Sequence, residues 1–174
     1  NKNNWENTLY VKGMTQLVIK QALVNFAYGG NFSGILDGTS EADSAGGQVS
    51  QICGAGQTSY RIYGDSSLKI SGGKVETYAV AGGRLDRRLI GNLRTEISGG
   101  EFDGQIAATF GANSNHLIDG NAATIIIGGH IKKGKADTQI IGGVANEGMI
   151  SGNVSLAIKD AVELDVGTSI SAAR

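Results

Sequence analysis

Few residues in this 174-residue chain have side chains suited to catalysis or metal binding, and they lie far apart in the sequence. Cys53 is the single cysteine, which excludes an internal disulfide and a zinc site built from several cysteines. The histidines, His116 and His130, fall at different positions of different sequence repeats, without a matching acid or cysteine, which argues against metal binding or nucleophilic catalysis. We therefore predict no catalytic residue, no metal ligand and no cofactor.

Acidic residues that could act as a pair are kept apart by the repeat described below. Cleavage of a polysaccharide needs two carboxylates that converge on one groove. Asp37 and Asp119 share one position of the repeat, but the repeats between them carry no acid there. Asp43, Lys69 and Glu96 share another position in consecutive repeats, with alternating charge. This order predicts a surface ladder of ion pairs rather than an acid/base pair.

Basic side chains gather in two short clusters, each of which could bind an anionic glycan or another partner. A solvated surface is the commoner meaning of such a cluster. The formal net charge of −1 gives no overall electrostatic reason to bind nucleic acid or an anionic membrane. The two clusters, kept as a possible ligand or partner surface, are Arg84, Arg87 and Arg88, and Lys132, Lys133 and Lys135.

A repeat positions these residues and accounts for the 28 glycines of the chain. Its anchor is a glycine that recurs at intervals of 25, 26, 27, 29 and 32 residues, each time with an aliphatic residue two positions before it. In the middle four repeats a Gly-Gly pair begins eight residues after the anchor. This part of the repeat therefore has a fixed length while the whole repeat lengthens. The anchors are Gly13, Gly38, Gly64, Gly91, Gly120 and Gly152.

Apolar residues alternate along this fixed part, which is the periodicity of a β-strand. Glycine recurs too often for a helix of useful length. A second glycine corner is expected after the Gly pair, so that each repeat contains three strands joined at glycines, where the backbone can turn through conformations closed to other residues. We expect this second corner at Gly29, Gly54, Gly82, Gly111 and Gly142.

Three strands per repeat with like residues in register predict an all-β fold, a right-handed parallel β-helix or solenoid of about six coils of 25–32 residues. The right hand follows from the general preference of parallel connections. Asp65, Asn92, Asn121 and Asn153 should stack as a polar ladder at one corner. We treat residues 1–174 as a single solenoid domain and as a fragment of a longer chain, in which further coils or a cap would cover both ends.

The arm between the Gly pair and the second corner is the part of the repeat that varies. By glycine spacing it measures eight residues in the first two repeats, then ten, twelve and fourteen. Insertions in a solenoid tend to mark its binding face. We therefore expect any binding surface on this side, in the arms that begin at Glu101 and His130.

The segments "YGDSSLKISGGKV", "IGNLRTEISGGEF" and "IDGNAATIIIGGHI" resemble the Gly-rich repeats of large bacterial surface proteins, above all the β-helical passenger regions of autotransporter adhesins. The resemblance covers nearly the whole chain and concerns the residues that build corners and core. It implies a non-enzymatic adhesion or stalk segment, extracellular on the bacterial cell surface. The implied partners are a host surface receptor, a matrix protein or a glycan, or the protein itself through side-by-side contact.

Two other functions are compatible with the same fold. One is a polysaccharide-acting β-helical enzyme, a lyase or glycosidase, which would release new reducing ends or unsaturated sugars. The other is a segment of a trimeric phage-type fibre, which would sediment as a trimer. For any of the three functions, we expect neither binding of nucleic acid nor direct insertion of this segment into a membrane.

Overall fold

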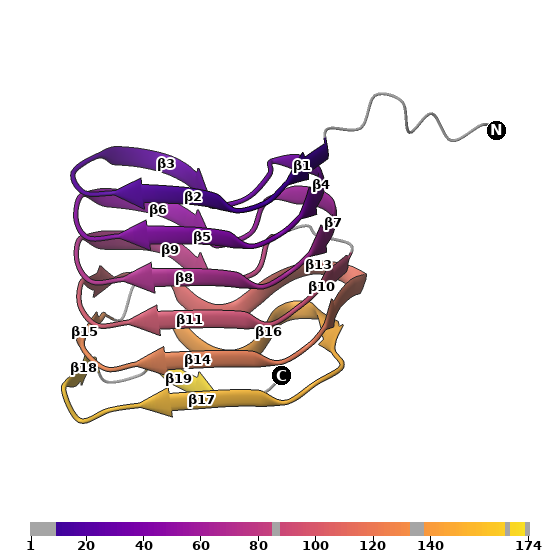
Figure 1. The fold of residues 1–174 in the computed structure, drawn as a ribbon. Coiled ribbons are helices and arrows are strands. Elements are labelled where there is room, and N and C mark those ends of the chain that lie inside the picture. Colours follow the sequence, from indigo (N-terminus) through magenta and orange to yellow (C-terminus); the bar gives the residue numbers. More distant parts are fainter. Residues whose placement is uncertain (1–9, 85–87, 133–137, 166–167, 173–174) are drawn as a thin grey trace, which may run out of the picture.

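The computed structural model describes residues 10–84, 88–132, 138–165 and 168–172, and these form nineteen β-strands and no helix. The strands stack in three columns along a solenoid (Figure 1). The first column, the front sheet, contains six strands: β2 (Thr15–Ile19), β5 (Ser40–Ser44), β8 (Ser66–Ile70), β11 (Leu93–Ile97), β14 (Ala122–Ile126) and β17 (Val154–Ile158).

The other two columns share a second, larger sheet. The side column contains β1 (Tyr10–Lys12), β4 (Ser33–Asp37), β7 (Thr58–Tyr63), β10 (Arg88–Ile90) and the last residues of β13 (Gln105–Asp119) and β16 (Gln139–Ile150). The arm column contains β3 (Leu23–Tyr28), β6 (Gln48–Cys53), β9 (Lys74–Val80), β12 (Glu101–Phe102), β15 (Gly129–Ile131), β18 (Val162–Leu164), β19 (Ser169–Ser171) and the first residues of β13 and β16.

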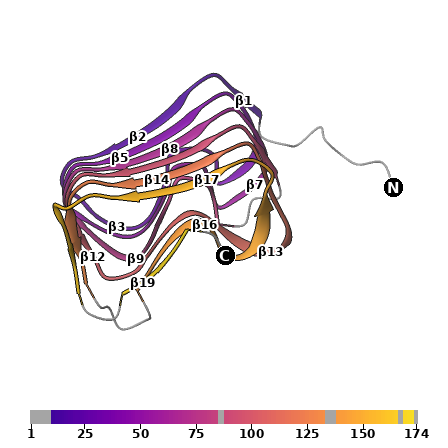
Figure 2. The same ribbon diagram turned by 90° about the horizontal axis from the view of Figure 1, so that it is seen from below.

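Parallel pairing in the front sheet confirms the predicted repeat. Thr15 pairs with Ser40, Ser40 with Ser66, and so on to Val154, at separations of 25, 26, 27, 29 and 32 residues. The six front strands bound five intervals and hence five complete turns, so the number of turns differs slightly from the six coils predicted. Followed from the N-terminal end, the chain turns clockwise as it recedes, which makes the solenoid right-handed (Figures 1 and 2).

Inward residues of all three columns fill the interior. The aliphatic residues two positions before the anchors are fully buried in the middle coils, at Leu36, Ile62, Leu89 and Ile118. Alternate residues of the front sheet are buried against them. Each such side chain contributes about 1.5–3 kcal/mol before the entropy of ordering the chain is subtracted. The core is therefore a set of stacked aliphatic columns.

Two threonines interrupt this apolar interior. Thr95 and Thr124 pair across β11 and β14 with both side chains fully buried, and neither hydroxyl has a hydrogen-bond partner. By contrast, the buried Ser40 hydroxyl donates to Ser66 Oγ over 2.9 Å, and Ser66 Oγ donates to the Ala81 carbonyl over 2.6 Å. The threonines are therefore places where the core is less stable than it could be.

Anchor glycines and the polar ladder fix the corner that precedes the front sheet. Gly64 has a φ of +141°, and a Cβ there would overlap the backbone of Gly38 in the coil before. Beside this corner the backbone N–H groups of Asn92, Asn121 and Asn153 each donate to a side-chain oxygen of the preceding coil, over 2.7, 3.0 and 2.9 Å. The ladder that begins at Asp65 is thus confirmed.

The second corner differs from the prediction in two coils. Cys53 pairs with Val80, and Val80 pairs with Ala107, so the corner falls one residue before Gly82 and three residues before Gly111. β13 runs through Gly111 without interruption. The prediction took the nearest glycine in each repeat as the corner. Because glycine is frequent in this chain, Gly82 and Gly111 lie near the corner without being the residues that stack on Gly54 there.

The arm lengthens in steps rather than steadily, which corrects the lengths taken from glycine spacing. From the inward residue that opens the arm to the last residue before the second corner, the separation is four residues in two coils, five in two and ten in the fifth. The first step is a β-bulge in β9. The paired ends are Val24 and Tyr28, Val49 and Cys53, Val75 and Val80, Phe102 and Ala107, and Ile131 and Ile141.

Candidate functional site

The outward surface of the arm column, the arm face, is where the sequence predicts a binding site. Figure 2 shows the arm strands of later coils extending farther from the front sheet than β3 does. This surface therefore differs from coil to coil, whereas the front sheet does not. Three groups of side chains on it are described in turn: paired charges, an apolar cluster and a column of rings and amides.

Charged residues near the start of each arm pair diagonally between coils. Lys74 Nζ lies 2.7 Å from Asp103 Oδ2, and Lys132 Nζ lies 2.6 Å from Glu101 Oε2. The hydrogen bond from Lys132 lowers the pKa of Glu101, and the hydrogen bond to Asp103 raises the pKa of Lys74. Because these groups are solvent-exposed, each pair adds little stability. They link neighbouring coils.

The described members of the two basic clusters have three different partners. The Arg84 guanidinium lies over the ring of Tyr78, 5.9 Å from its centre. Arg88 Nη2 lies 3.4 Å from Asp119 Oδ2 in the side column, and Lys132 pairs with Glu101 in the arm column. Arg87, Lys133 and Lys135 lie outside the described residues. A role of the six residues as one ligand surface remains a prediction.

The arm column buries apolar residues on its outer side as well as on the side that faces the interior. Neighbouring residues such as Ala79 and Val80 are both fully buried but belong to different clusters, because they face opposite sides of the strand. We call the group on the outer side the outer cluster: Cys53, Tyr78, Val80, Ala107, Ile141 and Ala145, with Tyr28 and Phe110 packed against it.

Aromatic rings hold the outer cluster together. The rings of Tyr78 and Phe110 stack with their centres 5.4 Å apart, and Tyr28 meets Phe32 edge to face at 5.9 Å. Burial raises the pKa of both tyrosines above the ordinary value of 10. Both phenols are therefore neutral at physiological pH, and both rings pack in or against the outer cluster.

A column of rings and amides passes through the outer cluster at Tyr78. Register places Phe26, Gln51, Tyr78 and Gln105 in line across β3, β6, β9 and β13, and Gln139 of β16 continues the line. The Tyr78 hydroxyl donates to Gln51 Oε1 over 2.5 Å, and Phe26 is 53% exposed. Amides can exchange hydrogen bonds with hydroxyl or peptide groups, and rings offer apolar faces. The exposed Phe26 ring and the partly exposed amides of the column therefore have the chemistry of a binding surface, whereas the Tyr78 ring is buried.

His130 has the matching acids that sequence spacing did not show. Its Nε2 lies 2.8 Å from Asp165 Oδ1, and its Nδ1 lies 3.8 Å from Glu163 Oε2. The expectation that His130 lacks a matching acid is wrong because the last coil contains one extra residue, which pairs Glu163 directly with His130. The three side chains fasten the last coil to the one before it.

His116 is a buried packing residue. It is 1% exposed, and its Nε2 lies 3.0 Å from Thr109 Oγ1. The Thr109 hydroxyl also lies 3.0 Å from the Gly83 carbonyl, to which it donates, so it accepts its second hydrogen bond from the imidazole N–H. This chain of bonds ties β13 to the turn after β9.

The predicted acidic positions lie in the expected register, but the predicted ladder of ion pairs between them does not form. Asp43, Lys69 and Glu96 do lie side by side across β5, β8 and β11. The ion pair formed by Glu96 is, however, with Arg94 of its own strand, at 2.8 Å. Asp119 lies against Arg88, as described above. Glu96 and Asp119 therefore act in surface pairs.

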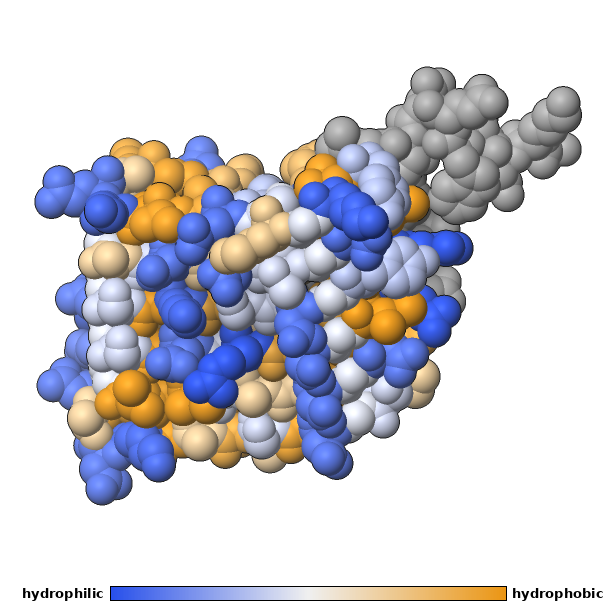
Figure 3. All heavy atoms as spheres, in the orientation of Figure 1, coloured by the Kyte–Doolittle hydropathy of each residue, from blue (hydrophilic) through white to orange (hydrophobic). Residues whose placement is uncertain are grey.

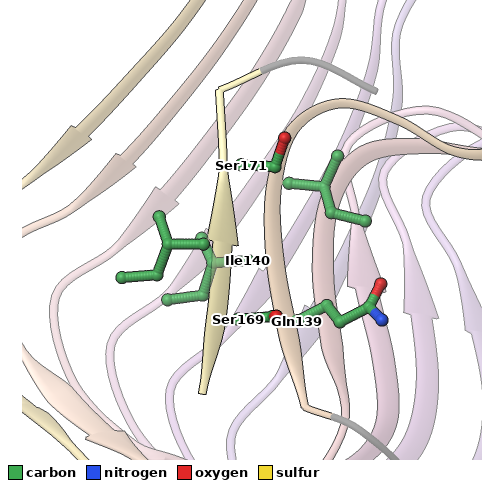
Figure 4. Close-up of a pocket in the computed structure, with 6 residues that line it drawn as sticks. Gln139, Ile140, Ser169 and Ser171 are labelled. Atoms are coloured by element: carbon green, nitrogen blue, oxygen red, sulfur yellow. The ribbon is translucent and has the colours of Figure 1, made fainter. Parts of the chain in front are cut away.

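A shallow hollow of about 160 Å³ lies at the C-terminal end of the arm column, between β16 and β19 (Figure 4). Its side chains are amide, hydroxyl and aliphatic, with no acid or base among them, so it offers binding groups and no proton-transfer group. The lining residues are Gln139, Ile140, Ile141, Ser169, Ile170 and Ser171.

The comparisons with other proteins do not assign this site. In the described residues, His, Cys, Asp and Glu form no group of three or more that could hold a metal ion. No helix in the same part of the chain is long and apolar enough to cross a membrane. The chain matches no protein-family model, no curated protein and no solved structure.

Proposed function

We propose that this chain is a non-enzymatic segment of a bacterial surface-exposed protein, where it serves as a stalk that mediates attachment or self-association. The observation that supports the proposal best is the front sheet, whose six strands pair residue for residue over five intervals. Nearest-neighbour stacking of this kind forms a rod in which each coil can template the next, without disulfides or cofactors.

The arm face is the part of the rod that we propose for attachment. Phe26 and Phe32 expose 53% and 61% of their surface near one end of it, and the amides of Gln51 and Gln105 stand farther along. Rings and amides together suit the apolar faces and hydroxyl groups of a glycan, or an extended peptide. The basic residues Arg84 and Lys132 would favour an anionic form of either ligand.

Attachment can be tested with beads coated with the protein and presented to host cells, matrix proteins and each other. We expect binding above that of uncoated beads, and we expect Phe26→Ser/Phe32→Ser to reduce it. A matched control, Ser67→Ala/Ser155→Ala on the front sheet, should bind as the natural sequence does. Binding to none of these surfaces would contradict the adhesive role.

The same preparation tests the enzymatic alternative. We expect no new reducing ends or unsaturated sugars when it is incubated with pectin-like polysaccharides. Sustained release of either product by the purified protein would overturn the non-enzymatic proposal. Loss of that activity in Asp37→Asn or Asp119→Asn would then locate the acid.

A further inference from the structure

Acidic and basic side chains that are neighbours on consecutive coils alternate in two outward columns of the middle coils. Opposite charges directly across a strand pair stabilise a sheet, and like charges in that position destabilise it. The alternation is therefore the arrangement that the fold itself favours. The residues in register are Lys74, Glu101, His130 and Glu163 in the arm column, and Asp43, Lys69 and Glu96 in the front sheet.

The side column contains an exception, a pair of arginines. Leu89 pairs with Ile62, so Arg88 stands beside Arg61 on the neighbouring coil, with strand axes about 4.8 Å apart. Both arginine side chains are exposed. No other column of the described strands places two bases side by side on consecutive coils. An anion bound between the two guanidinium groups would remove their repulsion.

Apolar and aromatic side chains surround the arginine pair. In the same column, Ile35 precedes it by one coil and Leu117 follows it, and both are half-buried. The next outward column has Tyr63, which is 36% exposed, and Ile90 beside the pair. Arg61 Nη1 lies 3.4 Å from the Tyr63 hydroxyl, to which it donates. The two positive charges therefore lie beside one accessible aromatic ring.

Two acids at the ends of neighbouring strands are hydrogen-bonded to other groups. Asp37 Oδ2 accepts a hydrogen bond from the Tyr10 hydroxyl over 2.8 Å. Asp65 Oδ1 accepts one from the backbone N–H of Asn92 over 2.7 Å, as the first member of the polar ladder. Figure 3 shows a hydrophilic stripe down the corner between the front sheet and the side column, where this ladder lies.

Asp119 is the acid that reaches Arg88. Its Oδ1 accepts a hydrogen bond from Ser151 Oγ over 2.9 Å, and its Oδ2 lies 3.4 Å from Arg88 Nη2. Because both side chains of this ion pair are about half exposed, it contributes little to stability. A guanidinium group has five N–H donors, so one long bond leaves Arg88 able to bind a second anion.

The chemistry of these side chains favours an anionic glycan as the ligand. An arginine fork binds a sulfate or carboxylate through two parallel N–H···O bonds. The Tyr63 ring offers an apolar face on which a sugar ring can pack. An extended peptide fits less well, because it is recognised mainly through a free strand edge, whereas β7 and β10 are each paired on both sides.

We propose that Arg61 and Arg88 bind the sulfate or carboxylate group of an anionic glycan, with a sugar ring packed on Tyr63. The site joins one arginine of the predicted basic clusters to another that lies a whole coil away in the sequence, because register places them side by side. It lies on the side column and does not rest on the attachment function proposed for the arm face.

Binding of soluble polyanions tests the site. We expect the protein to bind dextran sulfate and polygalacturonate but not unmodified dextran. Arg61→Gln/Arg88→Gln should weaken both interactions at least about tenfold, because two charge-assisted forks are lost. The matched control, Lys69→Gln/Arg94→Gln, removes the same charge from the front sheet and should weaken them less than about twofold. Equal weakening by both variants would mean that only overall charge matters, and it would overturn the proposal.

Further variants separate a glycan site from attraction to any anion. Arg61→Lys/Arg88→Lys keeps the charge without the fork and should weaken binding about three- to tenfold. Tyr63→Ser should weaken it about threefold, and unchanged binding would overturn the glycan assignment. Tighter binding of poly-glutamate than of polygalacturonate would overturn it too. If the natural sequence binds neither polyanion, the site itself is wrong, whether or not coated beads attach to cells.

Discussion

The front sheet and the arm column are made from the same repeats but respond differently to changes in chain length. Every front strand has five residues, and the six strands pair without a bulge. The arm column contains a bulge in β9 and an arm in its fifth coil that is ten residues long. The front strand thus keeps its length in every coil, and the additional residues of the longer repeats accumulate mainly in the arm.

The front sheet should therefore be most sensitive to a side chain added at its corner. We expect Gly64→Ala to destabilise the protein by about 2–5 kcal/mol, since the backbone has a φ of +141° and the new methyl group would overlap Gly38. Gly13→Ala is the matched control, because its φ is +107° but no atom lies within 4 Å of the added carbon. Urea denaturation measures both, and equal losses would show that backbone strain alone limits the corner.

The arm column should depend more on its outer packing than on its corners. We expect Tyr78→Ala to destabilise by about 3–4 kcal/mol, because it removes a buried ring stacked on Phe110. Tyr78→Phe keeps the ring and loses the hydrogen bond to Gln51, and it should cost about 1 kcal/mol. If Tyr78→Ala costs no more than Tyr78→Phe in thermal and urea unfolding, the outer cluster does not stabilise the arm.

The polar ladder separates the middle of the rod from its end. Asn121→Ala removes the acceptor for the backbone N–H of Asn153 and the side-chain bond to Asn92, and should cost about 1–2 kcal/mol. Asn153→Ala, in the last coil, should cost less in the same measurement. Amide hydrogen exchange at Asn153 should accelerate in the first variant.

Inside the front sheet a gain in stability is expected. Thr95→Val and Thr124→Val each replace a buried hydroxyl that lacks a hydrogen-bond partner by a methyl group of similar size, and each should stabilise by about 1 kcal/mol. Ser66→Ala serves as the opposite case, because that hydroxyl is hydrogen-bonded and its loss should destabilise. A loss of stability in both valine variants would mean that the threonine hydroxyls have a bonding role.

The smallest effect is expected from the paired charges of the arm. The pKa of Glu101 is lowered from 4.5 in the folded protein, so its pairing with Lys132 stabilises the fold above that pH and is lost as the pH falls through the lowered value. Glu101→Gln should therefore flatten the dependence of the unfolding free energy on pH in this acidic range. Glu147→Gln, at an exposed position of β16, is the control and should keep the slope of the natural sequence.

Sequence periodicity predicted the parts of the fold in which buried side chains recur at fixed spacing. The aliphatic residue before each anchor, such as Leu36 or Ile62, and the anchor glycine together identify the coil, its strands and the asparagine ladder. The second corner was misplaced at Gly111 because a glycine match carries no information on packing. The column from Ile52 through Ala79 to Ile106, which is buried throughout, gives the correct register.

The outer cluster could not be predicted from the same periodicity. Strand alternation assigns Cys53, Val80 and Ala107 to the solvent side of the arm column, and they do face outward. They are buried because β13 and β16 continue past the corner and cover them with Phe110 and Ala145. A signal was present in the run of apolar residues at Tyr78–Ala81, which lacks the alternation of a strand with one wet face.

The drift of the repeat from 25 to 32 residues bears on how the chain avoids misfolding. Coils of equal length could slide past one another by a whole coil and still satisfy every strand, which would trap the chain in a wrong alignment. Here successive intervals differ by one, one, two and three residues. A slipped coil would differ in length from the coil it lies against, and where the difference is one or three residues a strand that took it up would turn inward side chains outward. Unequal repeats thus leave one alignment in which all the coils fit.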